Sequence, residues 1–96
     1  MMVCALKVAD LADLRTYVRR TLCEINHLAE EAFAVRESRL TRRGEVCGLM
    51  FAVRGPRLDI YTAIWEVARN AVFFYDSRGE RRQITQLVDC EGLQVA

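Results

Sequence analysis

The chain has 96 residues, enough for one small domain with a hydrophobic core of its own. Hydrophobic residues make up 52% of the sequence and charged residues 28%, a balance that excludes an intrinsically disordered chain. The net charge of +1 excludes a general attraction of the whole molecule to nucleic acid or to anionic membranes.

The first residues do not have the pattern of a secretory signal or a membrane anchor. Residues 1–9 are apolar, but their only charge, Lys7, comes late instead of preceding a long apolar stretch. The longest apolar run, residues 46–53, has the length of a strand and falls well short of the roughly 18 residues of a membrane span. Four cysteines occur without a C-x-x-C pair, which is typical of reduced thiols. We therefore expect a cytoplasmic protein that does not bind membranes.

An amphipathic helix is predicted from about residue 11 to about residue 27. Asp10 is a suitable N-cap, and Asp13 places a carboxylate in the first turn, where the helix dipole favours negative charge. Apolar residues then recur at steps of three and four and form one stripe: Leu11, Leu14, Val18, Leu22 and Ile25. Residues 28–33 extend this pattern by about one turn.

After the helix, the pattern changes to strands separated by short turns. We predict strands at residues 35–41, 46–53, 58–67, 72–75 and 81–88. The continuous apolar run 46–53 is typical of a central strand covered on both faces. Asn70 suits a left-handed turn position, and residues 76–79 (Asp-Ser-Arg-Gly) are the clearest hairpin signal in the chain.

These elements predict a single α+β domain over residues 1–96, with an N-terminal helix packed on a four- to five-stranded antiparallel β-meander. Short turns force neighbouring strands to run antiparallel. Residues 89–96 are expected to form a tail.

The face of the sheet away from the helix is the most informative part of this prediction. Both faces of strand 58–67 are largely apolar, and one helix covers one face at best. We therefore predict a non-enzymatic interaction module that self-associates through its sheet face, as a homodimer, or that binds a protein or peptide there. The interface or ligand candidates are Tyr61, Trp65, Phe73 and Tyr75. The alternative is that the N-terminal segment or the tail covers this face.

Arginines gather at the predicted turns. Alternate turns of a meander lie at the same end of the sheet, so one end should hold a basic rim of Arg54, Arg57, Arg78, Arg81 and Arg82. A small-ligand or peptide pocket between helix and sheet is one alternative function, with Arg54 or Arg57 meeting an acidic group. Single-stranded nucleic-acid binding through the arginine-rich turns is another. Nucleic acid is the less favoured partner, because nearby acids return the net charge almost to zero.

Catalytic and metal-binding patterns are weak. Cys23 and His27 are four residues apart and are expected on the polar helix face, but no third group or oxyanion hole accompanies them. The same pair would be half of a zinc site, which Cys47 or Cys90 would have to complete across the fold. Nucleotide-binding glycine loops are absent from the sequence. We expect no enzyme activity, no cofactor and no metal, and the pattern leaves the role of Cys23 and His27 open.

Overall fold

The computed structural model describes residues 1–88, and the expected tail, with Cys90, lies outside them. The described elements are β1 (Met2–Lys7), α1 (Leu11–Ile25), the short 3-10 helix η1 (Glu30–Ala32), β2 (Val35–Arg42), β3 (Glu45–Arg54), β4 (Ile60–Glu66), β5 (Ala71–Tyr75) and β6 (Arg81–Val88). The predicted helix and the five predicted strands are confirmed, with ends that differ by no more than two residues. Among the described residues, no helix has the length and apolar character needed to cross a membrane.

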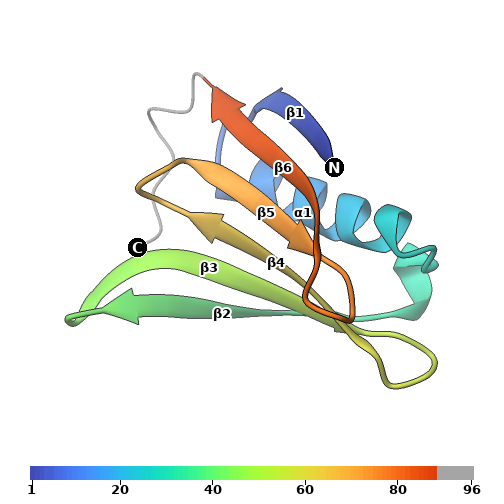
Figure 1. The fold of residues 1–96 in the computed structure, drawn as a ribbon. Coiled ribbons are helices and arrows are strands. Elements are labelled where there is room, and N and C mark those ends of the chain that lie inside the picture. Colours follow the sequence, from blue (N-terminus) through green and yellow to red (C-terminus); the bar gives the residue numbers. More distant parts are fainter. Residues whose placement is uncertain (89–96) are drawn as a thin grey trace.

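The sheet has six strands in the order β1-β6-β5-β4-β3-β2 (Figure 1). Strands β2 to β6 form the predicted antiparallel meander, whereas β1 pairs in parallel with β6. The expectation of four to five strands in a purely antiparallel sheet is therefore wrong, as is that of the helix as the first element. The connection through α1 carries the chain from one edge of the sheet to the other, which leaves β1 free to pair with the last strand.

Helix α1 begins where the sequence predicts because Asp10 caps it. The backbone N–H of Asp13 donates to the Asp10 carboxylate at 2.9 Å, and the Asp13 carboxylate accepts from the Ala9 N–H at 3.1 Å. The first bond satisfies a donor that the first turn would otherwise leave unpaired, and the second ties the residue before the cap to that turn. The helix ends at Ile25, and His27 then adopts a left-handed conformation with φ of 57°. Residues 28–33 form only η1 and do not extend the helix.

Three tight turns fix the register of the meander. Arg43 and Gly44 both have positive φ, 53° and 83°, which matches a two-residue hairpin turn between β2 and β3. Asn70, with φ of 48°, takes the predicted left-handed position between β4 and β5. In the β5–β6 hairpin, Gly79 has φ of 80°, and the Asp76 carboxylate accepts backbone N–H bonds from the turn at 2.9 and 3.0 Å. The predicted hairpin is confirmed.

The core lies between α1 and one face of the sheet. Its centre consists of large side chains with at most 2% exposure, among them Leu14, Val18, Leu22, Leu49, Phe51, Val53, Trp65 and Phe74. The helix stripe predicted from the sequence supplies the first three. One buried polar cluster lies within this layer: the Tyr17 hydroxyl is 2.7 Å from the Thr85 hydroxyl, and the Gln83 amide donates to both at 3.2 and 3.0 Å. The members of the cluster hydrogen-bond to one another, which offsets the free-energy cost of burying polar groups.

Candidate binding face of the sheet

The second face of the sheet, which we call the open face, is the one that α1 does not cover (Figure 1). The strand register aligns one residue from each strand in a row across the middle of this face: Val3, Ile84, Phe73, Ile64, Met50 and Ser38. Five of the six are apolar. Ile84, Ile64 and Met50 are partly exposed, and Val3 is 70% exposed at the edge. The open face therefore has an apolar centre that the rest of the described chain covers incompletely.

Arginines border this apolar centre. The next row towards the β3–β4 turn runs Arg36, Ala52, Thr62, Tyr75 and Arg81. The guanidinium of Arg81 lies 4.5 Å from the ring centre of Phe73 and 5.5 Å from that of Tyr75, and it donates to the Tyr75 hydroxyl at 3.1 Å. Arg69 approaches Phe73 from the other end, at 5.9 Å, and pairs with Glu66 at 3.8 Å. These cation–π contacts explain why Phe73 is only 4% exposed although no second layer of described residues covers it.

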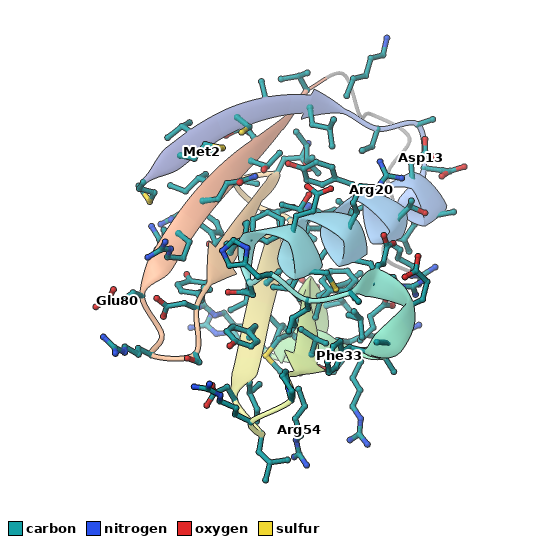
Figure 2. The ribbon with its side chains drawn as sticks, turned by 90° about the vertical axis from the view of Figure 1, so that its right-hand side faces the viewer. Met2, Asp13, Arg20, Phe33, Arg54 and Glu80 are labelled. Atoms are coloured by element: carbon teal, nitrogen blue, oxygen red, sulfur yellow. The ribbon has the colours of Figure 1, made fainter. Side chains whose placement is uncertain are left out.

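A pocket of about 310 Å³ opens on this face beside the edge strand β2. It is lined by Ala34, Arg36, Ala52, Val53, Arg54 and Ile60. Arg36 and Arg54 are diagonal neighbours in the β2–β3 register, which places their Cβ atoms about 7–8 Å apart. Figure 2 shows Arg54 at one end of the sheet, well away from α1. Within residues 1–88, neither arginine forms an ion pair or a side-chain hydrogen bond, so both guanidinium groups face solvent across an apolar floor.

The four aromatic candidates predicted from the sequence divide between the two faces. Trp65 is 1% exposed in the core, where its indole N–H donates to Asn70 at 3.3 Å, and Tyr61 packs against the same core. The expectation that these two side chains lie exposed on the second face is therefore wrong. Phe73 and Tyr75 do lie on the open face, beneath and beside Arg81. Alternation placed Tyr61 and Trp65 correctly on one face of β4, but the expectation that Phe73 and Tyr75 share that face is wrong, because the register pairs Phe73 with Ile64.

The five predicted rim arginines share one end of the sheet but do not form one cluster. Arg54 and Arg81 lie on the open face, as described above. Arg57 belongs to the β3–β4 turn and lines a different pocket, on the helix side, together with His27 and Tyr61. Arg78 is exposed in the β5–β6 turn, and Arg82 lies 4.0 Å from Asp76. Arg36 in β2 lines the pocket beside Arg54 but is absent from the predicted rim.

The helix residues considered for catalysis do not form a site. Cys23 is 1% exposed, and its burial raises the pKa of the thiol above its ordinary value of 9.0. The expectation that it lies on the polar helix face is wrong, because the helix packs deeply enough to bury this position as well as the main stripe. His27 lies beyond the helix end and is exposed. Over the described part of the chain, no three His, Cys, Asp or Glu side chains come close enough together to hold a metal ion.

These observations define the class of protein: residues 1–88 form a two-layer α+β domain with one α-helix, a mixed six-stranded sheet and one sheet face that α1 does not cover. Comparison of the chain with protein-family models, with curated proteins and with solved structures found no match.

Proposed function

We propose that this chain is a non-enzymatic interaction module whose open face binds an acidic, amphipathic segment of another protein. The observation that carries the proposal is the pair Arg36 and Arg54, which flank an apolar pocket next to the apolar central row. Arginine recognises carboxylates through paired hydrogen bonds, and the partly exposed aliphatic side chains beside it suit apolar groups of the same segment.

The charge of the open face favours this partner over a second copy of the same face. Among the described residues, Arg36, Arg54, Arg69 and Arg81 project from its middle or lie over it, and only Arg69 is paired there with an acid, Glu66. Two such faces stacked on each other would bring like charges together, which costs free energy in a desolvated interface. The self-association predicted from the sequence is better sought at another surface.

The same face suits single-stranded nucleic acid less well. Sequence-tolerant nucleic-acid binding relies on exposed aromatic rings on which bases stack. Phe73, the aromatic ring in the central row, is 4% exposed beneath Arg81, and the pocket floor between the arginines is aliphatic. A small ligand in the middle of the layer between helix and sheet is also disfavoured, because buried side chains of α1 such as Leu14 and Val18 fill it, and the helix-side pocket with Arg57 lies at the end of that layer.

The test is fluorescence anisotropy with a labelled peptide of alternating Glu and Leu, capped at both ends. The unmodified protein should bind it, and the double variant Arg36→Gln, Arg54→Gln should bind at least about tenfold more weakly, since a charge-assisted hydrogen bond contributes about 1.5–3 kcal/mol. Arg78→Gln is the matched control: it removes an exposed arginine away from the pocket and should leave binding unchanged. Circular dichroism checks that each variant is folded.

Two outcomes would overturn the proposal. One is the absence of binding to the acidic peptide at low salt. The other is tighter binding of oligo-dT than of the peptide, with equal losses in the double variant and the Arg78→Gln control. That second pattern would assign the arginines to nucleic acid and to general charge instead of to the pocket.

A further inference from the structure

The two edges of the sheet differ in how they are protected. Strand β2, at one edge, carries Arg36, Glu37, Arg39 and Arg42, and its pairing with β3 is interrupted by a bulge between Leu40 and Thr41. Charged side chains and bulges are the usual devices that keep an edge strand from pairing with another chain. The β2 edge is therefore protected against pairing with a strand of another chain.

Strand β1, at the other edge, has none of these devices. Its sequence, Met-Val-Cys-Ala-Leu-Lys, contains one charge, and that charge is at its end. It pairs with β6 over six consecutive positions with no register shift, so it is regular, and its outer edge meets no other described strand. Met2 is 60% exposed and Val3 is 70% exposed. Figure 2 shows β1 along the margin of the sheet, with Met2 at its start. A regular, apolar edge strand without such protection is a template on which another strand can pair.

We infer that β1 pairs antiparallel with β1 of a second copy of this chain, which joins two sheets edge to edge around a two-fold axis. The sequence of the strand favours its own copy as the occupant. Even-numbered residues of β1 face the helix side and odd-numbered ones the open face, so a pairing that keeps both helices on one side must match even with even and odd with odd.

One register satisfies this rule and pairs the whole apolar stretch. With Cys4 opposite the partner's Cys4, Met2 meets the partner's Leu6 and Val3 meets the partner's Ala5. The only charge, Lys7, then falls outside the apolar pairs and does not face its own copy. Apolar side chains are paired throughout, and the two Lys7 side chains lie at opposite ends of the pairing. This interface uses a different surface from the acidic-segment site proposed above, so either can fail without the other.

The experiment measures solution mass by size-exclusion chromatography with light scattering, over a series of micromolar concentrations. The unmodified chain should shift from monomer to dimer as concentration rises. Val3→Lys should stay monomeric at every concentration, because it sets a charge inside the apolar pairing, near the partner's Lys7. Leu58→Lys is the matched control: Leu58 is 73% exposed in the β3–β4 turn, away from β1, and this variant should dimerise like the unmodified chain.

A second readout tests the register without a variant. Residues opposite each other in an antiparallel pair have Cα atoms about 4.5–5.5 Å apart, which is within the range that a disulfide spans. Diamide, which takes up the two electrons and two protons released when two thiols join, should therefore yield a Cys4–Cys4 link between copies. Peptide mapping by mass spectrometry identifies it.

A chain that is monomeric at all concentrations overturns the inference. So does a dimer that survives Val3→Lys with that variant folded, or one whose cross-links run through the exposed Cys47 and not through Cys4. A concentration-dependent dimer that is lost in Val3→Lys and linked through Cys4 supports it.

Discussion

Gly48→Ala offers the sharpest test of the packing of this sheet. The bulge in the β2–β3 pairing makes Cys47 the extra residue, and the following Gly48 sits close against the neighbouring strand β4. A Cβ atom at Gly48 would overlap the carbonyl oxygen of Trp65 and would lie 3.3 Å from its carbonyl carbon. These are backbone atoms of an interior strand, so they cannot rotate away as a side chain could.

We expect Gly48→Ala to lower the free energy of unfolding by about 3 kcal/mol, the upper part of the usual range for overpacking. For a domain of this size, that corresponds to a fall in Tm of about 12–24 °C. Urea unfolding followed by the fluorescence of Trp65, the single tryptophan and a core residue, measures it.

The matched control is Gly44→Ala in the β2–β3 turn. A Cβ there would meet no atom within 4 Å, but φ is +83°, so the substitution introduces only left-handed backbone strain, about 1 kcal/mol. If Gly48→Ala cost no more than Gly44→Ala, the close approach of β3 and β4 at this position would be wrong.

Four further predictions concern buried or strained positions. Tyr17→Phe removes the hydroxyl that bonds Thr85 and should lower the free energy of unfolding by about 1 kcal/mol in urea titrations; an unchanged midpoint would contradict the buried polar cluster. Under native conditions iodoacetamide should label exposed Cys47 and spare buried Cys23, and equal labelling by peptide mapping would refute this. The folded-state pKa of Cys23 lies above 9.0, so the thiol loses its proton at lower pH in the unfolded chain than in the folded one, and this contribution to stability is lost as pH rises. Cys23→Ala should therefore lose less stability than the unmodified chain between about pH 8 and 10 in thermal melts. An equal loss in both would count against the pKa shift. Leu58→Gly should raise the free energy of unfolding by up to about 1 kcal/mol, seen as a higher Tm, since Leu58 has φ of 65° and is exposed; a lower Tm would show that its side chain contributes contacts that outweigh the strain.

Local patterns in the sequence were enough to predict the helix and the meander. The helix stripe, the alternation within strands and the turn residues Asn70 and Gly79 each act over a few neighbouring positions. Strand β1 was not predicted, because Met2–Lys7 is short and apolar without clear alternation, and its partner β6 lies at the other end of the described chain. Pairing over that distance leaves no local signal.

The candidate site shows the same limit. Alternation grouped Tyr61 with Trp65 within β4, as the register confirms, but it did not show that Phe73 lies beside Ile64 on the opposite face. Which group the helix covers is decided by the direction in which the chain leaves β1, and that is a property of the whole topology. The pocket between Arg36 and Arg54 depends on the diagonal register of β2 and β3, which residue spacing alone does not fix.

The pairing of β1 with β6 also bears on how the protein is made. Residues 2–7 leave the ribosome before the rest of this domain, whereas their partners, residues 83–88, are among the last of the described residues to emerge. Until then both edges of β1 are unpaired, whereas β2 to β5 can already pair with one another through their short turns. During synthesis the nascent chain thus carries an unpaired apolar strand. In this interval β1 is most accessible to chaperones or to the same strand on a neighbouring nascent chain.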